Sequence, residues 1–226
     1  MAARRVPLTL ITIMRVKPRD LPVLIAPPLL TGLARTARQG LRAAIARRRI
    51  ARQRRLHLAC GSNVLPGWAN VDLAGPAAVI KLDLTAPLPV ASDTLEAVYS
   101  EHFIEHIDRA QAQRLLAECH RVLEPGGVLR ISTPDLRTII DHYVAGRIDA
   151  WHDMQWRPET PARMLNESMR EWGHQFLYDA DELLAAFRAA GFRQIARKAW
   201  RASAHSGLAG LECRPDHGEL IYECTK

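Results

Sequence analysis

Short apolar runs separated by polar turns dominate the chain from residue 56 onward. Each run holds about five to seven residues and ends at, or one residue after, a small or acidic residue. The runs are LHLAC (56–60), WANVDL (68–73), AVIKLDL (78–84), LEAVYS (95–100) and GVLRIS (127–132). Apolar runs of this length, bounded by turn residues, are typical of buried strands. The pattern therefore predicts five strands, and two more follow at 192–200 and 219–224.

Helical periodicity appears between these strands. Residues 110–123 place apolar side chains at helical spacing, with Asp108 as the expected N-cap and the Glu-Pro-Gly-Gly turn at 124–127 as the stop. A second helix is expected at 181–190, capped by Asp179 or Asp181 and closed by Gly191. Strands that alternate with helices predict a parallel sheet, and ligands bind such sheets beyond the carboxyl ends of the strands.

Residues 146–178 lack clear periodicity. They are rich in tryptophan, methionine and proline, and include Trp151, Trp156 and Trp172. Loops of this length are usually functional or disordered. We expect an insertion or lid over the strand ends.

The net charge of +7 conceals a marked asymmetry. Residues 1–55 hold 14 of the 31 basic residues and one acidic residue, a net +13, whereas the remainder holds 17 basic against 23 acidic residues, a net −6. We therefore expect a basic extension over 1–54, partly helical or disordered, followed by one domain over 55–226. No apolar run approaches the roughly 20 residues of a membrane span. The four cysteines form no close pair, which favours a reducing, cytoplasmic compartment.

The basic extension contains an amphipathic helical pattern from Leu33 onward. Ala44 and Ile45 are expected on its apolar face, and arginines cover the rest. Such a helix could contact an anionic membrane surface weakly, or pack its apolar face on the domain that follows. Nucleic acid is an unlikely partner because the segment lacks aromatic residues that stack on bases.

The stretch His102-Phe103-Ile104-Glu105-His106 has the H-x-x-E-H spacing of some zinc hydrolases. A hydrolase would need a third ligand, and the next helix offers Glu118. The stretch also follows an apolar strand directly, where packing alone can account for it. We favour a site without metal and keep a zinc hydrolase as a minor alternative.

Taken together, the ordered motifs resemble the class I S-adenosylmethionine-dependent methyltransferases, and most closely a compact bacterial branch described as predicted methyltransferases. The resemblance covers residues 56–224. Its motifs are LHLACGSN, NVDL, LDLTAPLPV, AVYSEHFIEHI, ECHRVLEPGGVLRISTPDL and GHQFLYDADELLAAFRAAGF. It implies a Rossmann-like α/β fold: a mostly parallel seven-stranded sheet with helices on both faces and a C-terminal antiparallel strand pair.

The resemblance also implies a site for S-adenosylmethionine along the strand ends. The family's first loop usually reads as an acid followed by three spaced glycines, whereas here those positions are His57, Ala59, Gly61 and Asn63. Asp72 matches the acid that accepts from the ribose hydroxyls. Asp83, with the backbone of Leu84, matches the position that recognises the adenine amine. The expected cofactor residues are Ala59, Gly61, Ser62, Asn63, Asp72, Leu73, Asp83, Leu84 and Ser100.

For methyl transfer, the resemblance implies an oxygen or nitrogen nucleophile, on a small molecule or a glycan, that attacks the sulfonium methyl. Glu101 and His102 are expected at the rim for substrate contact or proton removal, and His174 is a further candidate base. His106 is expected to pack or to form hydrogen bonds. The loss of two motif glycines and of the acid keeps open a second class of function, a methyltransferase-like binding module without cofactor.

Overall fold

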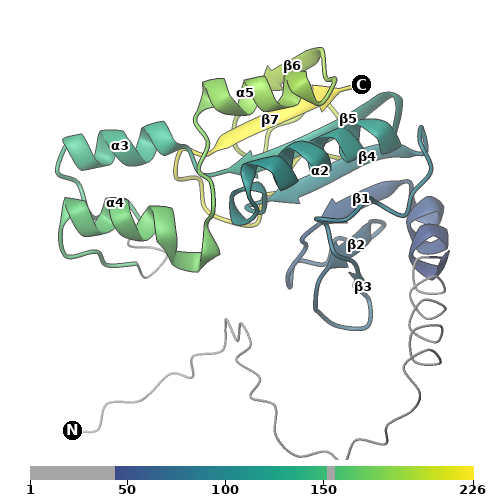
Figure 1. Cartoon of the computed structure of the whole chain (residues 1–226), viewed down its shortest axis with the longest axis horizontal. Helices are drawn as coiled ribbons and strands as arrows, with labels where there is room; N and C mark the ends of the chain where they lie inside the picture. Colours follow the sequence, from purple (N-terminus) through teal and green to yellow (C-terminus); the bar gives the residue numbers. More distant parts are fainter. Residues whose placement is uncertain (1–43, 152–155) are drawn as a thin grey trace, which may run out of the picture. The chain divides into compact units, whose positions relative to one another are not determined.

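The structure is a computed structural model that describes residues 44–151 and 156–226. Its strands form one seven-stranded sheet (Figure 1). They are β1 (Arg55–Leu58), β2 (Ala69–Asp72), β3 (Ile80–Lys81), β4 (Leu95–Glu101), β5 (Leu123–Thr133), β6 (Gln194–Arg197) and β7 (Leu220–Thr225). All seven expected strands are therefore present.

The α-helices of the sheet domain include both expected ones. They are α2 (Arg109–Val122), α3 (Leu136–Val144), α4 (Pro161–Arg170) and α5 (Ala180–Ala189), with short 3-10 helices η1 (Ile104–His106) and η3 (Glu171–Gly173). Asp108 caps α2 in a reciprocal capping box with Gln111, and Asp179 caps α5. Of the described helices, none combines the length and the apolar character that crossing a bilayer requires.

The strand order is β3-β2-β1-β4-β5-β7-β6. Strands β1 to β5 pair in parallel, and β7 pairs antiparallel with both β5 and β6. This confirms the predicted mostly parallel sheet with an antiparallel C-terminal pair. One detail differs: residues 124–127 do not form a separate turn but lie in the irregular first half of β5, because Leu123 already pairs with Leu95.

The crossover from β1 to β2 contains no helix. Only ten residues, 59–68, separate the two strands, yet Leu56 pairs with Ala69 in parallel register. An extended chain gains about 3.3 Å per residue, so these residues suffice to return along a four-residue strand. The Asn70 side chain fastens this loop, because its amide group accepts from Leu65 N and donates to the carbonyls of Leu65 and Trp68.

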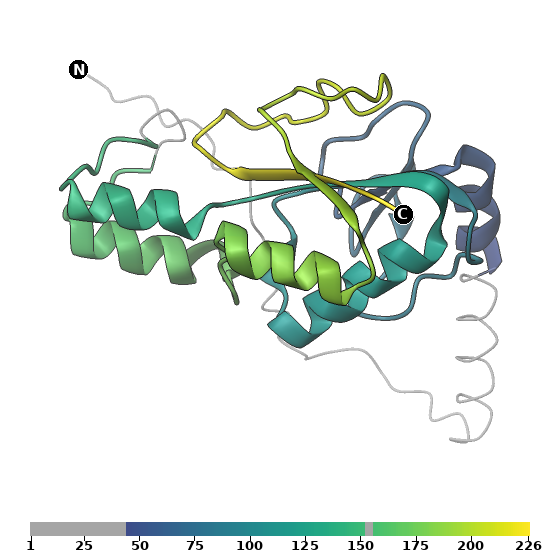
Figure 2. The same ribbon diagram turned by 90° about the horizontal axis from the view of Figure 1, so that it is seen from above.

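The two faces of the sheet are covered differently. Helices α2 and α5 lie side by side on one face, whereas the segment between β6 and β7 runs over the other face (Figure 2). On that second face, Trp68, Ala97, Tyr99, Val128 and Leu208 form an apolar cluster. Over the central strands this non-helical segment, rather than a helix, covers the second face.

The described part of the basic extension is a helix over residues 44–53. It buries Ala46 and Ile50 in the main core, one turn apart. Ala44 and Ile45, expected on the apolar face, are exposed instead. The interpretation that this helix packs on the domain is thus confirmed for its last turns, with a different pair of side chains, and residues 1–43 lie outside the described part of the chain.

The segment expected as an insertion contains one regular helix, α4, which lies beside α3 beyond the carboxyl end of β5 (Figure 1). Neither helix is among those predicted from the sequence. Thr160 at the N-cap and Pro161 at the first helical position are signals that could have located α4.

Candidate functional site

Parallel pairing brings the predicted site residues to one edge of the sheet. Leu58 pairs with Val71 on one side and with Ser100 on the other, so the chain segments after β1, β2 and β4 leave the sheet together. The connection that leaves β1 runs to β2, whereas the connection that leaves its other neighbour, β4, runs in the opposite direction to β5. This is a topological switch point, where open α/β sheets bind ligands.

The loop after β1 approaches the end of β2 with its backbone. Ala59 and Gly61 both adopt positive φ, +49° and +52°. Cys60 N donates to Val71 O, and Gly61 N donates to Asp72 Oδ2 at 2.9 Å. A Cβ on Gly61 would meet no atom within 4 Å, so open space lies on that side of the turn. One glycine and a small alanine thus form a tight turn without the usual three glycines.

Asp72 stands at the carboxyl end of β2 with both carboxylate oxygens facing backbone amides. Oδ2 accepts from Gly61 N, and Oδ1 accepts from Ala74 N at 3.2 Å. A carboxylate offers about four acceptor positions, so two remain for a ligand. The next side chain, Leu73, is 72% exposed at the same edge. The Asp72 carboxylate can accept from adjoining hydroxyl groups of a ligand, and the exposed Leu73 side chain can pack against an aromatic base of the same ligand.

Asp83 is exposed and forms a turn with Thr85. Its Oδ1 accepts from Thr85 N at 2.9 Å and from Thr85 Oγ1 at 2.7 Å, and neither of these bonds uses Oδ2. Leu84 buries its side chain in the main core, so only its backbone can face a ligand. Of the other predicted residues, Ser62 is exposed and Ser100 is buried in β4.

His57 occupies the position of the family's missing acid and does not replace it. The ring is buried, and its Nδ1 lies 3.1 Å from Asn70 Oδ1. Burial lowers the pKa of His57, and the nearby carboxylates of Glu101 and Asp72 oppose this only in part. The imidazole is therefore neutral at pH 7, and negative charge near this position comes from Glu101 and Asp72.

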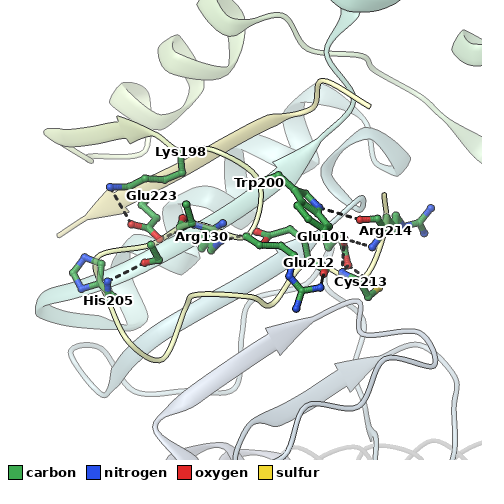
Figure 3. Close-up of polar contacts among 12 residues, drawn as sticks. Glu101, Arg130, Lys198, Trp200, His205, Glu212, Cys213, Arg214 and Glu223 are labelled. Atoms are coloured by element: carbon green, nitrogen blue, oxygen red, sulfur yellow. Dashed lines mark hydrogen bonds and ion pairs between the residues drawn. The ribbon is translucent and has the colours of Figure 1, made fainter. Parts of the chain in front are cut away.

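Glu101 was expected at the rim, free for substrate or for a proton. Its side chain is 9% exposed and holds the segment before β7 (Figure 3). Oε1 accepts from the backbone N–H groups of Cys213 and Arg214 at 3.0 and 3.1 Å, and Oε2 accepts from Cys213 Sγ at 3.0 Å. This arrangement makes Glu101 an anchor for residues 213–214.

A buried ionic network, which the sequence analysis missed, continues this anchor. Arg130 on β5 is fully buried and donates from Nε to Glu212 at 2.6 Å and from Nη1 to Glu223 at 2.7 Å (Figure 3). Its Nη1 also donates to Ala202 O. Arg130 stands in an apolar run of the sequence, and nothing in that run indicates that Glu212 and Glu223 neutralise its charge.

His102 lies between two carboxylates. Its Nδ1 is 3.3 Å from Glu105 Oε1 and its Nε2 is 3.2 Å from Glu219 Oε1. Burial lowers the pKa of His102, but the two glutamates outweigh it and raise the pKa to about 9. The ring is then an imidazolium at pH 7, which cannot accept a proton, so this arrangement does not fit the expected base.

His174 and His106 meet on the far side of Glu105. Their ring centroids are 4.9 Å apart, and His106 Nε2 lies 3.9 Å from Glu105 Oε1. His174 Nδ1 lies 2.7 Å from Ser168 O, and since a carbonyl can only accept, Nδ1 carries the proton. Nε2 of a neutral His174 ring is therefore an electron-pair donor.

The expected geometry of a zinc hydrolase is absent. His102 has φ +50°, and the residues after it form a 3-10 turn rather than an α-helix. Glu118, the expected third ligand, instead pairs with Arg121 and accepts from Leu88 N. Among the described residues, His102, His106 and Glu118 do not form a metal-binding group, so this alternative is not supported.

Residues 56–131 match the family described as "Methyltransferase domain". A probable S-adenosylmethionine-dependent methyltransferase of Mycolicibacterium smegmatis is 30% identical over 128 residues, which cover 56% of this chain and 45% of that relative. The chain thus spans less than half the length of the curated relative that it matches.

Solved structures with a similar arrangement have low sequence identity. A methyltransferase of Thermotoga maritima, described as a possible histamine N-methyltransferase, is 15% identical, with a TM-score of 0.48 over 85% of this chain and 97% of that one. A methyltransferase of Archaeoglobus fulgidus is 16% identical, with a TM-score of 0.46 over 83% and 94%.

Proposed function

We propose that the chain is a class I S-adenosylmethionine-dependent methyltransferase, which the match of residues 56–131 to the methyltransferase-domain family supports, and that it transfers a methyl group to an oxygen or nitrogen nucleophile of a small-molecule or glycan acceptor. The observation that carries the proposal is the position of Asp72 at the switch point, held by Gly61 N with two acceptor positions to spare. Bound S-adenosylmethionine would supply a methyl group on a positively charged sulfur, with S-adenosylhomocysteine as the leaving group.

Two further features fit the cofactor. Asn63 Nδ2 is buried in the loop after β1 and has no hydrogen-bond partner among the described residues. A buried donor without a partner is costly, and a ligand carboxylate or hydroxyl would satisfy it. The open space at Gly61 leaves room for the ligand beside the turn. Asp72, Leu73, Asp83 and the backbone of Leu84 would hold the nucleoside, and Ala59 to Asn63 would surround the amino-acid end.

The acceptor side of the proposal rests on the aromatic residues near the rim. The rings of Trp151, Trp156, Trp172 and His174 follow one another at centroid distances of 5.3, 5.1 and 5.7 Å. Trp172 is 43% exposed. Aromatic rings of this kind line small-molecule sites and offer flat apolar faces to a sugar or another ring.

The three candidate catalytic residues differ in whether their side chains are free to accept a proton from the acceptor. Glu101 and His102 are engaged by the protein, which favours positioning roles for both. His174 Nε2 makes no hydrogen bond among the described residues, so proton acceptance remains available there. In-line methyl transfer gains most from holding the two reactants at close range, and a base is needed only where the nucleophile must lose a proton.

The proposal also includes a cytoplasmic location and a weak contact of helix 44–53 with a membrane surface. All four cysteines are free, and three of them are buried, which supports a reducing cytoplasm. Exposed Arg47, Arg48 and Arg49 support weak contact of helix 44–53 with an anionic membrane surface. We do not expect nucleic acid as a partner.

The test is calorimetric titration of the full chain with S-adenosylhomocysteine, followed by transfer of labelled methyl groups to a panel of sugars and small hydroxyl or amine compounds. At a hundred times its dissociation constant the ligand stabilises the folded state by about 2.7 kcal/mol, and the melting temperature should rise by several degrees. A folded protein that binds neither S-adenosylhomocysteine nor S-adenosylmethionine contradicts the proposal and favours the binding-module function.

A further inference from the structure

Three side chains with metal-binding atoms converge where the tryptophan-rich segment meets the end of β4. Glu105 and His106 belong to η1, and His174 follows η3, 68 positions later in the chain. One ligand atom from each lies within 4.8 Å of the other two. The backbone brings them together, since Gln175 N and Phe176 N both donate to Glu105 O.

The carboxylate of Glu105 is incompletely satisfied. Glu105 is fully buried, and its Oε2 accepts from Thr133 Oγ1 at 2.9 Å. Its Oε1 has no hydrogen-bond partner among the described residues, and the nearest ring nitrogens are His102 Nδ1 at 3.3 Å and His106 Nε2 at 3.9 Å. Burying a carboxylate oxygen without a full set of partners is costly, and a cation in the group would offset this cost.

His174 is already oriented as a ligand. Its Nδ1–H donates to Ser168 O, which fixes the tautomer with the electron pair on Nε2. Metal-binding histidines almost always donate their second nitrogen in this way. Within the described residues no hydrogen bond to either ring nitrogen of His106 is found, so its imidazole is also available.

We propose that Glu105, His106 and His174 bind a divalent transition metal, with zinc as the occupant. Two imidazoles and one carboxylate are a common donor set for zinc, and three protein ligands leave a coordination position for water. Zinc ligands lie about 2.0–2.2 Å from the metal, so the three atoms must move slightly closer to one another than in the metal-free arrangement. The metal would fasten residues 171–174 to the end of β4.

This site differs from the zinc hydrolase pattern in its ligands and goes beyond the proposed function. His102 and Glu118 take no part in it, and none of its ligands belongs to the proposed cofactor residues. Metal binding and proton acceptance at His174 Nε2 exclude each other, because one electron pair serves both. The metal measurement therefore also decides which role His174 has.

The experiment uses the full chain, purified without a histidine tag, stripped with EDTA and dialysed against zinc at low micromolar free concentration. We expect one equivalent of zinc by elemental mass spectrometry, and a visible absorption spectrum of tetrahedral or five-coordinate cobalt when Co²⁺ replaces zinc. His174→Ala and His106→Ala should each weaken zinc binding at least tenfold. His205→Ala, at an exposed histidine in the segment between β6 and β7, should bind like the wild type.

X-ray absorption of the zinc-loaded wild type keeps the test independent of whether the variants fold. We expect two imidazole ligands and no sulfur. Wild-type protein that binds no zinc above background, a spectrum with thiolate ligands, or folded variants that bind like the wild type would overturn the proposal. Protein that binds S-adenosylhomocysteine but no zinc would overturn the metal site alone, and the reverse result would overturn the proposed function alone.

Discussion

Gly61 N donates to Asp72 Oδ2 at 2.9 Å and so joins the ends of β1 and β2 across the rim of the sheet. In this way the protein compensates for a glycine-poor first loop. The turn is fixed by a carboxylate from the neighbouring strand, and that carboxylate keeps acceptor positions for a ligand. The loop and the acid therefore act as one unit, and a change in either is expected to affect both.

Asp72→Asn should separate the two tasks of this carboxylate. The asparagine oxygen can still accept from Gly61 N, but its amino group cannot accept from Ala74 N, so the melting temperature should fall modestly. Loss of the charge should weaken S-adenosylhomocysteine binding about ten- to a hundredfold, because hydrogen bonds to charged groups contribute about 1.5–3 kcal/mol each. Calorimetric titration measures this change. Asp141→Asn, an exposed α3 residue paired with Arg137, is the matched control, and equal affinity in both variants would contradict the assignment.

Asp83 serves a turn in this structure, and its proposed role towards the adenine amine can be separated from that turn. Thr85→Val removes the hydroxyl bond to Asp83 and should lower stability by up to about 1 kcal/mol without changing ligand affinity. Asp83→Ala should weaken S-adenosylhomocysteine binding and abolish the preference over S-inosylhomocysteine, which lacks the amine. If the preference survives in Asp83→Ala, the aspartate is a turn residue only.

The places of the strands along the chain could be predicted from the sequence because each strand is a local apolar run with its own turn signals. The same holds for the Asp108 and Asp179 caps, whose partners lie three residues away. The alternation of the strands with helices predicted the parallel pairing, whereas the C-terminal antiparallel pair was implied by the family resemblance alone. Even the helix-free crossover after β1 follows from its length. These features depend on chain geometry and local composition, which a single sequence displays.

Long-range partners could not be predicted in this way. Glu101 meets Cys213, 112 positions later, and His102 meets Glu219, 117 positions later. Nothing near Glu101 or His102 indicates that a distant segment occupies their side chains, so both looked like free rim residues. The non-helical segment that covers the second face is also held by a long-range contact. It neutralises Arg130 through Glu212, 82 positions later in the chain.

Arg130→Met should destabilise the protein strongly. The substitution leaves Glu212 and Glu223 buried without their common partner, and breaking a buried ion pair in this way costs about 3–5 kcal/mol. Urea denaturation measures the free energy of unfolding. Arg137→Met breaks an exposed pair, which solvent screens, and should change the free energy of unfolding far less. Equal losses in the two variants would show that the network does not hold the segment before β7.

The last prediction concerns the thiol that Glu101 contacts. Burial and the carboxylate of Glu101 raise the pKa of Cys213 to about 11, so at pH 8 the thiol is almost entirely protonated. Only the thiolate reacts with iodoacetamide. Glu101→Gln removes the negative charge and should lower the pKa of Cys213, so the alkylation rate at pH 8 should rise and the midpoint of its pH dependence should move down.

Mass spectrometry can follow this reaction at Cys213 alone, because Cys60, Cys119 and Cys224 are buried and should stay unlabelled in the folded protein. Glu96→Gln, at an exposed glutamate of the same strand, is the control and should leave the rate unchanged. If Glu101→Gln alkylates at the wild-type rate, the carboxylate does not face Cys213 in solution. Glu101 would then be free at the rim, and its expected role towards the acceptor would regain support.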